Sequence, residues 1–248
     1  MKKNNSVALI TGGGTGIGFA IAKKLHSLKY TVVITGRRKK KLIEARRKLR
    51  TRCHIIENDI SDLKSIPSLV NSIEKKIGKI EILINNAGQH LRKIVLETSD
   101  DDWQNIVNTN LNSVFSLSRE CGKKMIKRKT GKIVMIGSVT TVMGLPDVAA
   151  YATTKTALMG LTRTLAIELG KYSINVNCVC PGFIQTDIFR RVRRKDPKRF
   201  KKILSRTPLK RFGKVEDISD VVGFLCSSDS KFITGSYIMV DGGFHSSF

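Results

Sequence analysis

The stretch Val7-Ala-Leu-Ile-Thr-Gly-Gly-Gly-Thr-Gly-Ile-Gly18 places a short apolar run directly before a glycine-rich turn. Ile17, Ile21, Leu25 and Leu28 follow at helical spacing. Such an apolar run is typical of a buried parallel strand. A glycine turn between a strand and a helix lets the backbone approach a pyrophosphate, and the helix N-terminus offers N–H groups and a positive dipole end. The stretch therefore predicts a phosphate cradle rather than an ordinary flexible turn.

Apolar runs alternate with amphipathic helical runs along the whole chain of 248 residues. This alternation predicts an α/β protein with a single-domain Rossmann fold, a doubly wound seven-stranded parallel sheet with helices on both faces, and one domain spanning residues 1–248. The expected strands are residues 7–10, 31–35, 53–57, 80–84, 131–136, 174–180 and 237–240. The expected helices are residues 17–28, 39–48, 62–77, 100–125 and 217–226, and one that begins near 149.

The net charge of +25 is concentrated in two windows. Residues 37–52 hold ten basic residues against one acidic residue, and residues 190–211 hold twelve against one. A solvated basic face is one interpretation, and attraction of anionic ligands is another. Nucleic-acid binding is a third interpretation, but the basic runs lack the interleaved aromatic residues that stack on bases.

The chain shows neither an apolar leader after Met1 nor an apolar run near the roughly 20 residues that span a membrane. We therefore expect a soluble cytoplasmic protein. The five cysteines are scattered, and Cys178 and Cys180 point to the same face of a predicted strand. With no histidine or second cysteine pair beside them, structural thiols are favoured over a disulfide or a metal site.

The segment Tyr151-Ala-Thr-Thr-Lys155 puts a phenol and an ammonium on one face of a helix. A nearby cation favours the phenolate, so we expect Lys155 to lower the pKa of Tyr151 and prepare it for proton transfer. The pattern alone is common on exposed helices. It gains weight from Asn110, an amide on an otherwise apolar helical stripe, and from Ser138, a hydroxyl at the end of a predicted parallel strand, where ligands bind in such sheets. A satisfied core asparagine is the alternative for Asn110.

Together with Asn85-Asn-Ala-Gly88 and Pro181-Gly182, these motifs stand in the order and spacing of the short-chain dehydrogenase/reductases, which the chain resembles from Ser6 to Gly243. The resemblance implies hydride transfer between a nicotinamide cofactor and a carbonyl or secondary alcohol. It also implies a homotetramer. The implied catalytic residues are Asn110 as anchor of a relay water, Ser138 as holder of the substrate oxygen, Tyr151 as proton donor and Lys155 as a ribose contact.

The same resemblance implies the residues that bind the cofactor, with Asp59 near the adenine and Ile184 and Thr186 near the nicotinamide carboxamide. The full set is Gly12, Gly14, Thr15, Gly16, Ile17, Gly18, Arg37, Arg38, Asp59, Ile60, Asn86, Ala87, Gly88, Tyr151, Lys155, Pro181, Gly182, Ile184 and Thr186.

The end of the second predicted strand indicates which cofactor is used. An acidic residue there would bond the ribose hydroxyls of NAD, but Gly36-Arg37-Arg38 stands in that place. A guanidinium can grip a 2′-phosphate, so we predict NADP(H), with NAD(H) as the alternative. Thr15 argues against a strict preference for NADP(H), because many NADP-dependent relatives carry a basic residue at that position.

Two substrate classes remain open. Residues 131–143 and 181–187 look most like 3-oxoacyl-acyl-carrier-protein reductases, and the basic segment 187–211, which resembles a substrate lid, would suit an acidic carrier protein. Lys127-Arg128-Lys129 would suit the same partner. Residues 85–93 and Thr207-Pro208 resemble sugar and sugar-acid dehydrogenases, such as gluconate 5-dehydrogenase or glucose 1-dehydrogenase. A basic nucleic-acid-binding protein and a non-enzymatic scaffold are lower alternatives, and no membrane partner is expected.

His90 has no partner that the sequence reveals, so we expect it on the surface or at the rim of the cleft.

Overall fold

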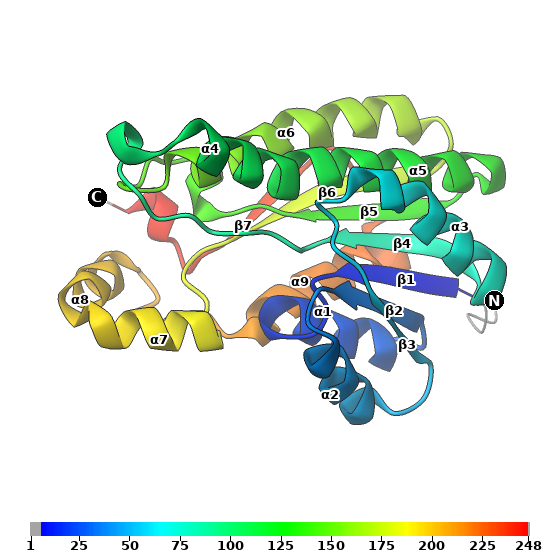
Figure 1. Cartoon of the computed structure of the whole chain (residues 1–248), viewed down its shortest axis with the longest axis horizontal. Coiled ribbons are helices and arrows are strands. Elements are labelled where there is room, and N and C mark those ends of the chain that lie inside the picture. The colour runs from blue at the N-terminus through cyan, green and yellow to red at the C-terminus, as the bar shows by residue number, and fades with distance from the viewer. Residues whose placement is uncertain (1–5, 248) are drawn as a thin grey trace.

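Seven parallel strands form one sheet in the order β3-β2-β1-β4-β5-β6-β7 in the computed structural model, which describes residues 6–247 (Figure 1). The chain runs outward from β1 to β3 and then returns to β4 beside β1, so the winding reverses between β1 and β4. This confirms the predicted doubly wound parallel sheet. The strands are β1 Ser6–Thr11, β2 Thr31–Gly36, β3 Cys53–Glu57, β4 Lys79–Asn85, β5 Gly131–Ile136, β6 Ile174–Pro181 and β7 Tyr237–Val240.

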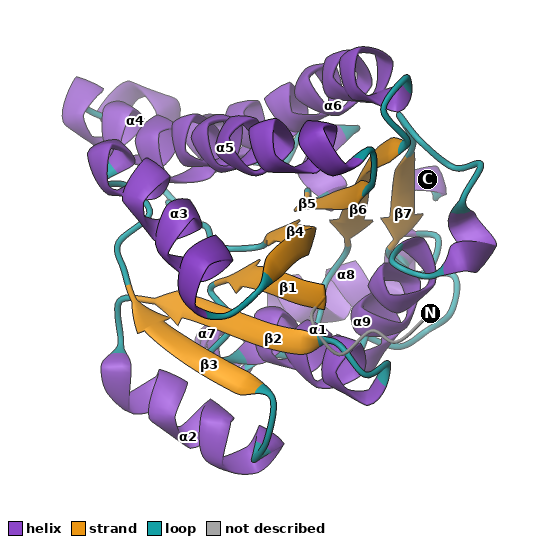
Figure 2. Ribbon diagram, turned by 90° about the vertical axis from the view of Figure 1, so that its right-hand side faces the viewer, coloured by secondary structure: helices purple, strands orange, loops and turns teal. Residues whose placement is uncertain are grey.

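Helices cover both faces of the sheet, with α3, α5 and α6 on one side and α1, α2 and α9 on the other (Figure 2). Residues 1–5, where the sequence indicated no apolar leader, and residue 248 lie outside the described part. The helices are α1 Gly16–Ser27, α2 Lys39–Leu49, α3 Ile66–Lys76, α4 Asp100–Val107, α5 Ser113–Arg128, α6 Ala149–Gly170, α7 Asp187–Lys195, α8 Pro197–Arg206 and α9 Val215–Leu225.

Strand β1 is buried along its full length, which explains the apolar run from Val7 to Ile10. Val7 and Leu9 belong to the core under α3, α5 and α6, whereas Ala8 and Ile10 belong to the core under α1, α2 and α9. Successive side chains of a strand point to opposite faces, so a strand covered on both sides needs apolar residues at every position.

The helix predicted over residues 100–125 is interrupted. α4 ends at Val107, a π turn spans Asn108–Asn112, and α5 begins at Ser113. A π turn inserts an extra residue into the helical repeat and is frequent at functional sites. Asn110 is fully buried, as the apolar stripe predicts, whereas Trp103 on the α4 side of the π turn is 40% exposed.

The predicted lid consists of two helices, α7 and α8, at the end of the molecule where the central strands terminate (Figure 1). Phe189 of α7 packs edge-on against Phe200 of α8, with ring centroids 4.8 Å apart, and lies at the same distance from Phe212. The lid thus has its own small apolar core, while most of its basic side chains are exposed. No helix among residues 6–247 is both long and apolar enough to cross a membrane.

Candidate active site

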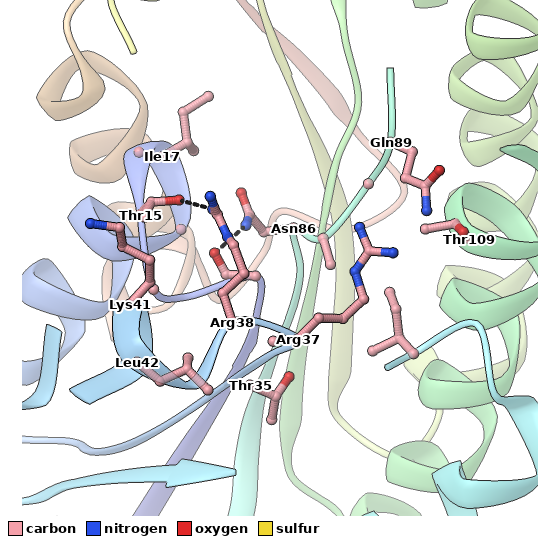
Figure 3. Close-up of a pocket in the computed structure, with 18 of the residues that line it drawn as sticks. Thr15, Ile17, Thr35, Arg37, Arg38, Lys41, Leu42, Asn86, Gln89 and Thr109 are labelled. Atoms are coloured by element: carbon pink, nitrogen blue, oxygen red, sulfur yellow. Dashed lines mark hydrogen bonds between the residues drawn. The ribbon is translucent and has the colours of Figure 1, made fainter. Parts of the chain in front are cut away.

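A cavity of about 550 Å³ opens where the winding of the sheet reverses, the usual ligand position in such folds (Figure 3). Its walls are the glycine turn, the end of β2, the loops after β3 and β4, and the first turn of α7. Of the predicted cofactor residues, it is lined by Gly12, Gly14, Thr15, Gly16, Ile17, Gly18, Arg37, Arg38, Asp59, Ile60, Asn86, Ala87, Gly88 and Thr186.

The glycine turn is fastened to the end of β4. Asn86 Nδ2 donates to the carbonyls of Thr11, at 2.8 Å, and Gly12, at 3.3 Å. Thr11 Oγ1 accepts from the backbone N–H groups of Asn86 and Ala87. Gly12 has a φ of +65°, and a Cβ there would lie 2.9 Å from Asn86 Nδ2, so this position favours glycine. The rigid turn and the N-terminus of α1 fit a dinucleotide pyrophosphate.

The adenosine end of the cavity is cationic. Arg38 donates to Thr15 Oγ1 at 3.2 Å, and Arg37 extends into the cavity with one guanidinium nitrogen 3.8 Å from Asp59 (Figure 3). Burial acts to raise the pKa of Asp59, but hydrogen bonds from Ser61 and the charge of Arg37 outweigh it and lower the pKa. Asp59 is therefore a carboxylate. Two guanidinium groups stand at the end of β2, where an NAD-specific site would present an acid.

The four predicted catalytic residues come from three parts of the fold. Tyr151 and Lys155 lie on the first turns of α6, Ser138 follows β5, and Asn110 lies in the π turn. Gly88, in the loop after β4, lies next to both Asn110 and Lys155. A Cβ built on this glycine would lie 3.2 Å from Asn110 Oδ1 and 3.6 Å from Lys155 Nζ. Lys155 is 5% exposed, and its ammonium lies 5.7 Å from the centroid of the Tyr151 ring.

The pKa of Tyr151 is raised, chiefly by burial, with the Ser138 hydroxyl acting in the opposite direction. The prediction that Lys155 lowers this pKa is therefore wrong for this structure. The Lys155 ammonium donates to the carbonyl of Ile136 at 2.7 Å and faces the ring rather than the phenolic oxygen. Burial lowers the pKa of Lys155 itself to about 8, which brings its ionisation into the working pH range.

The side chain of Asn110 is held on both of its polar atoms. Its Oδ1 accepts from the N–H of Gln89 at 2.7 Å, and its Nδ2 donates to the Gln89 carbonyl at 2.9 Å and to Thr154 Oγ1 at 3.3 Å. These bonds join the π turn to the loop after β4 and to α6. The buried amide is thus satisfied, and a water on it stays a prediction; Oδ1 retains one lone pair that could accept from such a water.

His90 was expected to have no partner, but its ring packs against Tyr151 with centroids 4.7 Å apart. The residue is exposed in part while its ring is partly buried, as expected for the rim of a cleft. Burial of the ring and the charges of Arg199 and Arg92 lower the pKa of His90. Only its place two residues after the Asn-Asn-Ala-Gly motif could have indicated this contact from sequence.

Other lining residues were not predicted, and several predicted residues lie elsewhere. The additional lining residues are Thr35, Gly36, Lys41, Leu42, Asn58, Gln89, Thr109, Asp187 and Arg191. The side chain of Ile184 is buried and its backbone bridges to Gly213, while Gly182 packs against Asp241. Pro181, Gly182 and Ile184, together with Tyr151 and Lys155, do not line this cavity, so their cofactor contacts stay predictions.

The five cysteines are free and buried. The Sγ atoms of Cys178 and Cys180 lie 3.7 Å apart, which confirms that both point to one face of β6. Among residues 6–247, no three histidine, cysteine or acidic side chains lie close enough together to hold a metal ion.

Comparison with known proteins agrees with this geometry. A family model described as enoyl-(acyl carrier protein) reductase matches residues 12–245. The 3-oxoacyl-[acyl-carrier-protein] reductase of Aquifex aeolicus is 38% identical over 98% of both chains, and that of Buchnera aphidicola is 35% identical over 99% of both. A gluconate 5-dehydrogenase from Burkholderia cenocepacia, solved with NADP and tartrate, superposes with a TM-score of 0.93 at 32% identity and covers 98% of this chain and 96% of that one.

A further solved structure, the actinorhodin polyketide ketoreductase with NADPH, has a TM-score of 0.93 and 29% identity, and covers 98% of both chains. The glycine turn, the residues that surround the cavity and the Tyr151–Lys155 pair occur in a chain whose full length matches these enzymes. The chain therefore belongs to the short-chain dehydrogenase/reductase family of NAD(P)-dependent oxidoreductases.

Proposed function

We propose that the protein is an NADPH-dependent 3-oxoacyl-[acyl-carrier-protein] reductase that acts in cytoplasmic fatty acid synthesis. The observation that carries this proposal is full-length similarity, at 34–38% identity, to reductases of that name from several bacteria. The grouping of Asn110, Ser138, Tyr151 and Lys155 beside Gly88, which lines the cavity, supports it, because these residue types suit proton delivery to a carbonyl oxygen.

The bound nicotinamide would supply the hydride that reduces the carbonyl carbon. A phenol with a raised pKa is protonated at neutral pH, so Tyr151 is ready to donate its proton to the oxygen of a substrate. The Ser138 hydroxyl would hold that oxygen. Lys155 remains largely cationic below its pKa of about 8, and its ammonium, placed by the Ile136 carbonyl, would bind the ribose hydroxyls of the nicotinamide half.

The preference for NADP(H) is supported by the two arginines at the end of β2. Arg37 is tied only loosely to Asp59, at 3.8 Å, so its guanidinium can turn to a 2′-phosphate. Arg38 keeps its place through Thr15. The glycine turn and the N-terminus of α1 would hold the pyrophosphate.

A carrier protein would meet a strongly basic surface. α7 and α8 expose basic side chains around their small aromatic core, whereas Lys127 and Arg128 lie at the opposite end of the molecule, where Arg128 is paired with Glu74 at 2.9 Å (Figure 1). Acyl carrier proteins are acidic, so charges of this kind would speed association. α5 and α6 also expose Phe115 and Ile167, which supports the proposal that these helices pack against neighbouring subunits of a homotetramer.

Oxidation of NADPH, followed with two kinds of substrate, tests the proposal. We expect turnover of acetoacetyl thioesters, with carrier-bound acetoacetate used more efficiently than the free thioester. Turnover of neither thioester, under conditions where NADPH binds, would refute the assignment. Light scattering of the same preparation would measure the number of subunits.

A sugar-acid oxidoreductase is the second candidate, favoured by two arginines near His90, the residue that packs against Tyr151. His90 contacts the Tyr151 ring, and Arg92 and Arg199 lie close enough to affect the pKa of His90. Arg92 is partly neutralised by Asp147, at 3.1 Å, but a substrate carboxylate could share it. Reduction of 5-ketogluconate without reduction of acetoacetyl thioesters would select this function instead.

A further inference from the structure

The first turns of α1 and α7 approach each other at the cavity. A Cβ built on Gly16, where α1 begins, would lie 3.4 Å from the Thr186 methyl group. Thr186 is the N-cap of α7, and its hydroxyl accepts from the N–H of Phe189 at 3.2 Å. The lid helix therefore starts against the same glycine turn that would hold a pyrophosphate.

Two side chains of α7 line the cavity from this direction, Asp187 and Arg191. They are four residues apart and so share one face of the helix. The other basic residues of α7 do not line the cavity: Arg190 pairs with the Asp187 carboxylate at 3.3 Å, and Arg193 lies over the Phe212 ring at 5.3 Å from its centroid. Arg191 is thus the arginine that the lid presents to the cavity.

The guanidinium of Arg191 is, like that of Arg37, only weakly held by other protein groups around the cavity. Arg37 is near Asp59, Arg38 donates to Thr15, and Lys41 is paired with Glu44 at 2.7 Å. Within residues 6–247, Arg191 makes one hydrogen bond, a long one of 3.4 Å from Nε to the Asp187 carbonyl. Most of its five N–H donors therefore remain free for an anion.

The position of Arg191 distinguishes between the phosphates of a dinucleotide. Arg37 and Arg38 stand at the end of β2, where a 2′-phosphate would lie. Arg191 lines the cavity from the helix whose N-cap, Thr186, contacts Gly16, so we place its guanidinium nearer to the glycine turn than to the end of β2. A planar guanidinium matches two phosphate oxygens at once, whereas glycine-turn N–H groups reach the pyrophosphate from the opposite side.

We propose that Arg191 is a cofactor-binding residue that grips the pyrophosphate and so ties the lid helix α7 to the bound cofactor. This inference rests on the proposed function only in requiring a nicotinamide dinucleotide in the cavity. Its consequence is that cofactor binding fixes the lid before substrate enters. The lid would then be seated by NADPH and by NADH alike, because both carry the same pyrophosphate.

Cofactor titration in the absence of substrate tests the proposal through the quenching of protein fluorescence or calorimetry. We expect Arg191→Ala to raise the Kd of NADPH and the Kd of NADH by the same factor, about tenfold, which is typical for loss of one charge-assisted contact. Arg191→Lys should retain part of the affinity. The matched control is Arg194→Ala, which removes an exposed arginine of the same helix that does not line the cavity.

Limited digestion with trypsin gives a second readout, because α7 and α8 are rich in cleavage sites. NADPH at saturating concentration should slow cleavage within the lid of the wild type and of Arg194→Ala, but much less in Arg191→Ala. Circular dichroism confirms that each variant is folded.

Equal affinities of Arg191→Ala and Arg194→Ala for both cofactors would overturn the proposal. A loss confined to NADPH would also overturn it, because Arg191 would then serve the 2′-phosphate. These outcomes are separate from failure of the proposed function, which would appear as absence of dinucleotide binding by the wild type or absence of thioester turnover.

Discussion

The two ends of this site, one proposed for catalysis (the catalytic end) and one for the adenosine of the cofactor (the adenosine end), are built on different physical principles. At the catalytic end, Lys155 is 5% exposed and Asn110 is fully buried, and both are held by short hydrogen bonds to the backbone. At the adenosine end, the side chains of Arg37 and Asp59 are 60% and 44% exposed and stand 3.8 Å apart. One end is positioned by burial and the other by exposed charge.

This difference predicts how each end responds to its surroundings. Interactions between exposed charges are screened by salt, and individual exposed ion pairs contribute little. Buried groups are screened much less by salt, but burial shifts their pKa values, as it does for Tyr151 and Lys155. We therefore expect the catalytic end to be sensitive to pH and the adenosine end to be sensitive to ionic strength.

The largest effect should come from Tyr151→Phe, which removes the proton donor and keeps the ring. The packing against His90 is retained, so the site should stay assembled. We expect kcat to fall by about 100- to 10,000-fold, the usual contribution of a general acid, while the Kd of NADPH is unchanged. Steady-state kinetics and cofactor titration measure the two quantities. Substantial turnover by the variant would show that another group supplies the proton.

The next largest effect should be a loss of kcat/KM above pH 8. Burial lowers the pKa of Lys155 to about 8, so its cationic form is lost as the pH rises through that value. We expect kcat/KM of the wild type to fall by about tenfold per pH unit above it. A profile that stays flat to pH 10 would contradict this role of Lys155.

Unfolding of the protein must be separated from this loss. The pKa of Lys155 is lower in the folded state, at about 8, than the ordinary value of 10.5, so the unfolded chain binds more protons between these values. The contribution of Lys155 to stability therefore increases with pH in this window. The activity should thus be lost while circular dichroism still shows a folded protein.

A smaller effect is expected at the adenosine end. Arg37→Ala should weaken NADPH binding by about tenfold and leave NADH binding unchanged, because only NADPH carries the 2′-phosphate. The difference between the two cofactors should also shrink as salt is added to the wild type, since Arg37 is exposed. Cofactor titrations at low and moderate ionic strength measure both effects. Equal affinity of the wild type for the two cofactors would refute the role of Arg37.

The sequence was sufficient to predict those elements whose local residue pattern follows directly from their burial. β1 and the glycine turn were predicted because a strand buried on both faces must be apolar throughout and the turn must be small. The strands β3, β5 and β7 were predicted with the bounds that the structure shows. The pairing of Cys178 with Cys180 on one face follows from strand periodicity alone.

The features that sequence did not predict depend on contacts between distant segments. The π turn at Asn110 has no simple periodic signature, although it delivers the amide to Gln89. The contact of His90 with Tyr151 joins residues 61 positions apart. The direction of the Tyr151 pKa shift was mispredicted, because spacing along a helix indicates proximity to Lys155 but not the extent of burial. Arg191 could not be told from the other lid arginines without the orientation of α7.

The smallest expected effect concerns the exposed charges of the lid. Like the charges at the adenosine end, they would act at the substrate entrance through electrostatic attraction that salt screens. Lys195, Lys198 and Lys202 are exposed on α7 and α8, whereas Arg193 packs over Phe212 and is kept to preserve the lid core. If an acidic carrier docks here, changing these three lysines to glutamine should raise KM for the carrier-bound substrate a few-fold at low salt, because rim charges mainly affect association. The same variant should leave KM for a free acetoacetyl thioester unchanged. Steady-state kinetics on both substrates, at low and moderate salt, make the comparison. Equal changes for the two substrates would eliminate carrier docking at the lid, and the reductase activity proposed for the buried catalytic end would be unaffected.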